Sequence, residues 1–155
     1  MKKKGMGIVG AIMPVAVFFL LLPGVEAHPA IAQASRCASC AMEVLKYPGP
    51  KGVQREKTYC SARALLCDVL TRGTSAGAWV HDAGKTDWAH PEDEAFIPVD
   101  GAWYVYGSQK KAVMGPSLAP FGSQQAAQAF QKREGGVLYR FDELTPQVLG
   151  CRAKN

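Results

Sequence analysis

An internal repeat is the feature of this sequence that most constrains its fold. Residues 58–70, TYCSARALLCDVL, and residues 120–132, PFGSQQAAQAFQK, share one layout: an aromatic residue, a small residue, a serine, and then apolar residues at helical spacing. Ser61 and Ser123 are placed to cap helices, since a serine hydroxyl accepts a hydrogen bond from a free amide of the first turn. A glycine follows each segment, as expected where a chain leaves a helix. The sequence therefore predicts two equivalent helices.

Strand-like sequence flanks both predicted helices. GVQREKTYC precedes the first and AWYVYGSQKKAVMG the second, while AWVHD and VLYRFD follow them; such runs of β-branched and aromatic residues are typical of strands. Each half is thus predicted to run strands, helix, strand. A repeat that occurs twice is too short for a solenoid, which needs about three units to bury its faces. We therefore expect an α+β fold in which the two halves pack on each other.

The predicted halves are residues 37–92 and 93–149, preceded by an N-terminal linker, 28–36, and followed by a frayed tail, 150–155. The segment GKTDWAHPEDEAFIPVDG between the strand-rich regions contains many turn formers and acidic residues, so we predict a surface loop there.

The first 27 residues have the pattern of a secretory signal peptide. Three lysines precede the apolar run GIVGAIMPVAVFFLLL, which is shorter than the ~20 residues that span a membrane. Cleavage is predicted after Ala27, with Ala34 as the second choice, and no cysteine stands at the end of the run to accept a lipid. We therefore predict a periplasmic protein, exported by a cleaved signal peptide, with no lipobox cysteine. The remaining basic residues are scattered, which disfavours nucleic acid as a partner.

All five cysteines follow this leader. An odd number in an oxidising compartment means that at least one thiol is free, metal-bound or intermolecular. Cys60 and Cys67, if both are helical, lie roughly 10 Å apart along the helix axis, beyond the ~7 Å between Cα atoms that a disulfide allows. We interpret Cys67 as a buried apolar residue, and the disulfide states of Cys37, Cys60 and Cys151 stay open.

The segment SRCASCAMEV places Cys37, Cys40 and Met42 within a few positions of each other. If residues 40–42 are extended, Cys40 and Met42 project from the same face. A thiolate and a thioether are soft ligands that select Cu(I), whereas zinc prefers four cysteine or histidine donors. The alternatives are a disulfide that closes a turn, a structural zinc module and a redox pair; the last is disfavoured because the neighbouring YPGP cannot lie inside a helix.

Further candidate ligands lie later in the chain. Met114 precedes the second helix much as Met42 precedes the first, so the symmetry of the halves would bring it to the same ion. His81 stands beside Asp82 on a predicted strand, where a carboxylate can orient an imidazole for a metal. A structural role for His81, and core positions for both methionines, are the alternatives.

The sequence contains no nucleophile elbow, no P-loop and no dinucleotide fingerprint, which favours a binding protein over an enzyme.

Several linked motifs resemble the nitrous oxide reductase accessory proteins of the NosL family, which are copper chaperones. They cover residues 37–149 in the following order: CASCAM, YPGPKG, YCS, WVHDAGKTDWAHPED, AWYVYGS, VMGPSLAPF and GGVLYRFDEL. The resemblance implies two ββαβ halves, a fold related to organomercurial lyases, and delivery of Cu(I) through a membrane ABC-type maturation complex to nitrous oxide reductase. It places the Cu(I) motif on Cys40 and Met42, with Met114 as a contributor and His81 or His90 less firmly assigned.

Three departures from the family pattern matter. Ala41 stands where the family has glycine, and a positive φ there would strain the turn by about 1 kcal/mol. The lipobox cysteine and a histidine-rich tail are missing from the sequence. We expect a monomeric Cu(I) carrier that works by ligand exchange, with Cys37 as an exchange ligand or as the thiol that protects Cys40. The alternatives are a thiol enzyme like the organomercurial lyases and a structural zinc or disulfide module.

Overall fold

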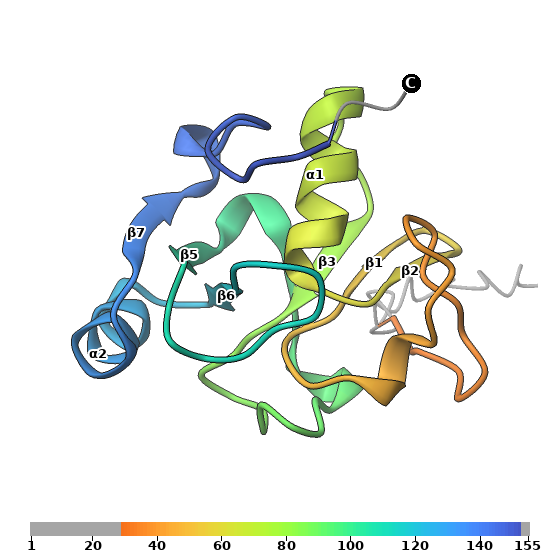
Figure 1. The fold of residues 1–155 in the computed structure, drawn as a ribbon, viewed down its shortest axis with the longest axis horizontal. Helices are drawn as coiled ribbons and strands as arrows, with labels where there is room; N and C mark the ends of the chain where they lie inside the picture. The colour runs from red at the N-terminus through yellow and green to blue at the C-terminus, as the bar shows by residue number, and fades with distance from the viewer. Residues whose placement is uncertain (1–28, 153–155) are drawn as a thin grey trace, which may run out of the picture.

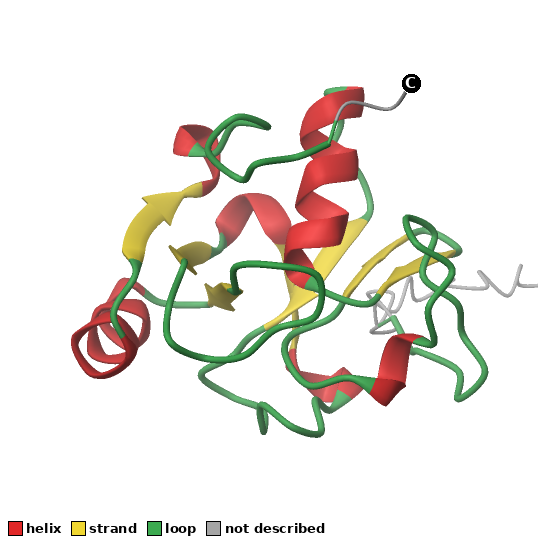
Figure 2. Ribbon diagram, viewed as in Figure 1, coloured by secondary structure: helices red, strands yellow, loops and turns green. Residues whose placement is uncertain are grey.

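The computed structural model describes residues 29–152. The predicted signal peptide, residues 1–27, and the end of the predicted tail, residues 153–155, lie outside this range. Within it the chain forms two antiparallel sheets and two α-helices, so the predicted α+β class is confirmed (Figure 1; Figure 2). None of the described helices combines the length and the apolar character needed to cross a membrane.

The first sheet has the strand order β2-β1-β3-β4. Its strands are β1 (Gly52–Gln54), β2 (Lys57–Tyr59), β3 (Ala78–His81) and β4 (Phe96–Pro98), and α1 (Ala62–Arg72) connects β2 to β3. The second sheet repeats this layout in the order β6-β5-β7. Its strands are β5 (Trp103–Tyr106), β6 (Leu118–Phe121) and β7 (Val137–Arg140), and α2 (Gln124–Glu134) connects β6 to β7. Short 3₁₀ helices complete the fold: η1 (Val44–Lys46), η2 (Asp93–Ala95), η3 (Val99–Gly101) and η4 (Phe141–Glu143).

The two predicted helix caps are confirmed. The Ser61 side chain accepts a hydrogen bond from the amide of Ala64 at 3.1 Å, and the Ser123 side chain accepts one from the amide of Ala126 at 3.3 Å. The first helix ends at Gly73, whose φ of 68° is left-handed. Each half is therefore a hairpin, a capped helix and a third strand that returns beside the first.

Helix α1 lies between the two sheets, while α2 covers the far side of the second sheet (Figure 1). The close approach of α1 to β1 depends on Gly52, because a Cβ atom there would lie 2.6 Å from the Leu65 side chain. Side chains alternate across β5, so that Tyr104 joins the larger core around α1 and Val105 joins the smaller core under α2. The larger core thus contains residues of both halves, as expected if the halves pack on each other.

Three regions differ from the sequence prediction. The segment expected as a surface loop contains β4, which lies within the predicted second half but pairs with β3 and extends the first sheet. Residues 150–152, expected to belong to a frayed tail, are held to the fold: the carbonyl of Gly150 accepts from Arg63, and Cys151 forms a disulfide. In the predicted linker, Ile31 is buried and its amide donates to the Asp93 carboxylate at 2.9 Å.

Candidate metal centre

Three free thiols meet at the start of α1. The Sγ atoms of Cys37, Cys40 and Cys60 all lie within 4.8 Å of one another, and those of Cys40 and Cys60 are 3.6 Å apart. We call these three side chains the thiol cluster. Cys37 and Cys60 are buried, whereas Cys40 is half-buried, so Cys40 is the member that faces outward.

The edge of the first sheet positions the thiol cluster. Cys60 follows β2 directly and precedes the helix cap Ser61, so both elements fix its backbone. Residues 36–38 run parallel to β2: Cys37 forms a bridge with Thr58, and the amide of Ala38 donates to the carbonyl of Thr58 at 2.9 Å. This pairing brings the two buried thiols together although they are far apart in the sequence.

Residues 37–42 form a tight turn. The amide of Cys37 donates to the carbonyl of Met42 at 2.9 Å, and the amide of Ala41 donates to the carbonyl of Cys37 at 2.8 Å. Ala41 has a φ of 59°, so this position carries the strain of about 1 kcal/mol expected of a non-glycine residue there. The assumption that residues 40–42 are extended is therefore wrong, and strand alternation does not align Cys40 with Met42.

The pKa values of the two buried thiols are shifted in opposite directions. Interaction with the Cys60 side chain, followed by hydrogen bonds from the amides of Cys60, Ser39 and Cys40, holds the pKa of Cys37 well below its usual range despite burial. Interaction with Cys37 and burial raise the pKa of Cys60. Of these two thiols, Cys37 therefore ionises first, and the Cys60 thiol beside it keeps its proton.

A buried lysine lies beneath the thiol cluster. The side chain of Lys51 is fully buried, and its Nζ donates to the carbonyls of Cys60 at 3.1 Å, Pro48 at 3.4 Å and Tyr47. Burial lowers the pKa of Lys51 to about 8, an effect that the charges of Cys60 and Cys37 oppose. The ammonium form therefore predominates at neutral pH next to the thiols.

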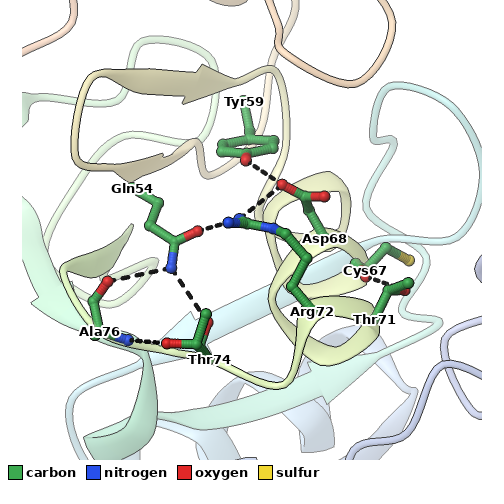
Figure 3. A network of polar contacts seen from close by, with 8 residues as sticks. All are labelled: Gln54, Tyr59, Cys67, Asp68, Thr71, Arg72, Thr74 and Ala76. Carbon is green, nitrogen blue, oxygen red and sulfur yellow. Dashed lines mark hydrogen bonds and ion pairs between the residues drawn. The ribbon is translucent and has the colours of Figure 1, made fainter.

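A polar network braces the elements that carry Cys60 (Figure 3). The Tyr59 hydroxyl donates to Asp68 of α1 at 2.5 Å, and Arg72 contacts the same carboxylate at 2.8 Å. Arg72 also reaches Gln54 on β1, whose side-chain amide donates to the carbonyls of Thr74 and Ala76 at 3.2 Å. Burial, and then Asp68, raise the pKa of Tyr59, so the phenol keeps the proton it donates. The network fixes β2 against α1, one residue before Cys60.

A cleft of about 600 Å³ opens beside Cys40. Its walls include Met114 from the loop before β6, Arg63 from α1, and the bridged pair Cys67 and Cys151. Arg63 binds the walls together, since its guanidinium donates to the carbonyls of Met114, Leu149 and Gly150 at 2.8–2.9 Å. The cleft therefore joins α1, the loop before β6 and the C-terminal segment around the outward thiol.

The disulfide corrects the interpretation of Cys67 as a buried apolar residue. Cys67 lies partly buried on α1 and is bonded to Cys151, across a sequence separation of 84 residues. The prediction that Cys60 and Cys67 do not bridge is confirmed, because Cys60 lies before the helix and stays free.

The structure places the other predicted ligands in different surroundings. Met114 is 51% exposed and shares the cleft with Cys40, so the predicted approach of these two segments is observed. Met42 is half-buried and does not line the cleft. His81 is not brought to the thiols: its ring is buried against Phe96, and its Nδ1 accepts from the amide of Lys51 at 3.2 Å. Burial lowers the pKa of His81 to about 4, which leaves the ring neutral.

Sequence reasoning missed Cys60 and Lys51 as members of this site. Both stand inside short motifs that drew notice for other reasons, YCS as a helix start and YPGPKG as a turn. A thiol directly before a helix cap was the available signal for Cys60. Chemically, the arrangement offers two or three thiolates to a soft metal ion, a buried positive charge beside them, and a thioether across the cleft.

Comparison with known proteins identifies similar chains. A model of the protein family described as NosL matches residues 28–149. A "Copper-binding lipoprotein NosL" of Stutzerimonas stutzeri is 35% identical over 127 residues, which is 77% of this chain and 67% of that protein. A protein of the same name from Achromobacter cycloclastes is 32% identical over 124 residues, 71% of this chain and 63% of that protein. The chain thus spans about two thirds of the length of these relatives.

A solved structure has the same fold. The crystal structure of the copper chaperone NosL from Shewanella denitrificans superposes with a TM-score of 0.71 at 35% identity, and the match covers 81% of this chain and 99% of that one.

The relatives also correct the predicted localisation. Both curated relatives are named lipoproteins, that is, proteins anchored by a lipid on a cysteine. This finding contradicts the prediction of a periplasmic protein with a cleaved signal peptide and no lipobox cysteine, which is therefore wrong. The prediction depended on residues 1–27, which lie outside the described range.

Proposed function

The chain belongs to the NosL family, and from this premise we propose that it is a copper carrier that binds Cu(I) through the thiol cluster and releases it by ligand exchange. The observation that carries the proposal is the convergence of three free thiols within 4.8 Å, with one of them, Cys40, in the wall of a cleft. The names of the relatives supply the metal, since two are called copper-binding and one a copper chaperone.

The chemistry of the donors favours the cuprous ion. Thiolates and thioethers are soft, and they select Cu(I) over harder ions. The Cys37 thiol, held in a form that ionises readily, is the first donor, and Cys60 and Cys40 complete a set of two or three. The binding step releases protons from the thiols, because a metal-bound cysteine is a thiolate.

The cleft provides the route for transfer. Cys37 and Cys60 are buried, so an incoming ligand reaches the metal on the side of Cys40. Met114 lies half exposed in the same cleft and offers a neutral thioether that exchanges more easily than a thiolate. In this mechanism a soft donor of the partner replaces Cys40 or Met114 in a stepwise exchange, with no change in oxidation state. His81, whose ring packs against Phe96 and is not among the clustered donors, takes no direct part. Met42, which follows the turn that carries Cys37 and Cys40, stays a predicted thioether ligand.

Nitrous oxide reductase is the proposed client, and a membrane ABC-type maturation complex is the proposed intermediary. This part of the proposal is supported by the family resemblance of the motifs from CASCAM to GGVLYRFDEL. A monomer is sufficient for the site, since all three thiols come from one chain.

The enzyme alternative is less well supported. A thiol enzyme that breaks carbon–metal bonds needs an acid that donates a proton at the thiols. Asp68 lines the same cleft as Cys40, but its carboxylate accepts a hydrogen bond from Tyr59 and pairs with Arg72. These contacts hold the carboxylate in the polar network that braces β2 against α1.

Titration of the reduced protein with Cu(I) against a competing chelator tests the proposal. Wild type is compared with Cys40→Ala, Met114→Ala and Met42→Ala. A structural zinc site of four ligands contributes ~10–16 kcal/mol, so loss of one thiolate is expected to weaken binding roughly 100-fold or more. Met114→Ala and Met42→Ala each remove a neutral thioether and are expected to have smaller effects.

The double variant Cys67→Ser with Cys151→Ser is the matched control, because it removes two sulfur atoms from the cleft wall and leaves the thiol cluster intact. Its Cu(I) affinity should equal that of wild type. An unchanged affinity in Cys40→Ala, or a preference of the reduced wild type for Zn(II), would refute the proposal.

A further inference from the structure

Lys51 is a charge buried without a carboxylate partner. Its side chain has no exposed surface, and its Nζ is surrounded by three backbone carbonyls. In the part of the chain that the structure describes, no carboxylate forms an ion pair with it. Carbonyl groups solvate an ammonium ion but do not neutralise it, so burial of this charge costs free energy unless an anion lies nearby.

The anions available to Lys51 are the thiolates. The Nζ of Lys51 donates to the backbone carbonyl of Cys60 at 3.1 Å, and the Cys60 thiol lies within 4.8 Å of the other two thiols of the cluster. The backbone fixes this arrangement from both sides: the amide of Lys51 donates to His81 Nδ1 at 3.2 Å, and its carbonyl accepts from the amide of His81 at 3.1 Å. The side chain itself is fully buried, with its Nζ at the carbonyl of Cys60.

We propose that Lys51 is a specificity-determining residue: its buried ammonium is the counter-charge of the metal-bound thiol cluster, and it favours monovalent copper over divalent zinc. This inference rests on the proposed function. For the same number of thiolates, a Cu(I) complex carries one more unit of negative charge than a Zn(II) complex. A fixed positive charge beside the donors stabilises the more anionic complex, and it repels the divalent ion more strongly than the monovalent one.

The summed charge of the metal ion, its thiolates and Lys51 is zero when one cuprous ion is bound by two thiolates. One cuprous ion and two thiolates carry a net charge of −1, which Lys51 neutralises. Zinc on the same two thiolates is neutral before Lys51 is counted, so the lysine leaves an uncompensated positive charge in a buried site. Zinc reaches neutrality only when the third thiol also ionises.

The test compares metals and lysine variants. Cu(I) and Zn(II) affinities are measured by chelator competition for the reduced wild type and for Lys51→Gln, Lys51→Met and Lys51→Arg. Lys51→Gln retains amide donors for the surrounding carbonyls, and Lys51→Arg retains the charge. Lys57→Met is the matched control, since Lys57 is an exposed lysine on the neighbouring strand β2. Metal-free variants are checked for folding by circular dichroism and thermal unfolding.

The expected result is a fall in the ratio of Cu(I) affinity to Zn(II) affinity of ~10- to 100-fold in Lys51→Gln and Lys51→Met. The ratio should stay at the wild-type value in Lys51→Arg and Lys57→Met. If Lys51 had a role in packing alone, its replacement would weaken the binding of both metals by the same factor.

Three outcomes overturn the inference. These are an unchanged ratio in a folded neutral variant, an equal loss for both metals, and a shift in Lys51→Arg as large as in Lys51→Gln. If one of the two neutral variants, Lys51→Met or Lys51→Gln, does not fold, the affinity ratio of the other neutral variant is compared with that of Lys51→Arg. Failure of the wild type itself to bind Cu(I) refutes the proposed function and is distinguishable from each of these.

Discussion

The two halves of the molecule share one strand register, yet only the first contains free thiols. Tyr59 on β2 faces Gly52 on β1 in the first sheet, as Phe121 on β6 faces Trp103 on β5 in the second. In both halves the aromatic residue stands two positions before the serine that caps the helix. The halves can therefore be compared residue by residue.

This comparison pairs Cys60 with Gly122 and Lys51 with Ala102. The thiol and the lysine are thus both present in the first half, and the second half has small neutral residues at both positions. Such a paired difference supports a shared role for the two side chains.

The second half uses the equivalent position to join the halves. A Cβ atom on Gly122 would lie 2.8 Å from the Asp82 carboxylate at the end of β3, so the glycine makes room for this close contact. The next residue, Ala83, donates its amide to the carbonyl of Pro120 on β6 at 2.8 Å. The residue before the cap of α1 therefore carries a thiol, whereas the equivalent residue before the cap of α2 makes room for a contact with the first half. The same local geometry thus has a different role in each half.

The largest expected effect is on Cu(I) affinity, when Cys60 is replaced by the glycine found at the equivalent position of the second half. Cys60→Gly removes a thiol from the cluster, and since one metal–thiolate bond contributes several kcal/mol, we expect a loss of Cu(I) affinity of ~100-fold or more. Gly122→Ala is the counterpart: it should lower the free energy of unfolding by crowding Asp82 and leave Cu(I) affinity unchanged. Chelator competition and urea unfolding measure the two quantities. Equal losses of Cu(I) affinity in Cys60→Gly and Gly122→Ala would contradict the different roles assigned to the two positions.

The disulfide ties α1 of the first half to the segment that follows the second half. Because the bridge closes a sequence separation of 84 residues, Cys67→Ser should lower the free energy of unfolding by ~2–4 kcal/mol. Urea unfolding of the variant, and of wild type with and without reductant, measures this loss. An unfolding midpoint that does not move on reduction would contradict it.

The helix caps test the equivalence of the halves directly. Ser61→Ala and Ser123→Ala each remove one hydrogen bond to the first turn, so each should cost about 1 kcal/mol of stability. Only Ser61→Ala is expected to weaken Cu(I) binding as well, by a few-fold, because Ser61 adjoins Cys60. A comparable copper effect in Ser123→Ala would show that the caps act through global stability.

The smallest effect concerns two left-handed residues, one in each half. Ala41 has a φ of 59° and Met114 a φ of 64°. Glycine relieves such strain but increases the entropy of the unfolded chain, so we expect Ala41→Gly and Met114→Gly each to stabilise by only ~0.5 kcal/mol. Thermal unfolding checks the sign. Only Met114→Gly should also change copper transfer, since it removes the thioether.

Local signals in the sequence were sufficient for most of the fold. The serine caps, the glycine after each helix and the runs of alternating residues each act within a few positions, so they predicted both halves. The strand β4 was missed because FIP lies in an acidic, turn-rich segment, and it becomes a strand only through its pairing with β3. Its stabilisation is tertiary and leaves little trace in the local sequence.

Of the candidate site, the sequence predicted the thiols that lie close together in the chain. Cys37 and Cys40 are neighbours in the sequence, whereas Cys60 joins them because residues 36–38 lie along β2. Lys51, in a turn rich in glycine and proline, has the sequence context of a surface residue. Its burial results from three carbonyls, those of Tyr47, Pro48 and Cys60, that meet only in the folded chain. The bridge to Cys151 likewise depends on where residues 150–152 pack.

The position of residues 150–152 has a consequence for access to the outward thiol. The cleft beside Cys40 is walled in part by Gly150, Cys151 and Arg152, and the Cys67–Cys151 disulfide fastens this wall to α1. Reduction of the bridge removes one attachment of the wall and leaves the hydrogen bonds that Arg63 donates to it. Solvent access to Cys40 is therefore coupled to the redox state of a cysteine pair that lies outside the thiol cluster.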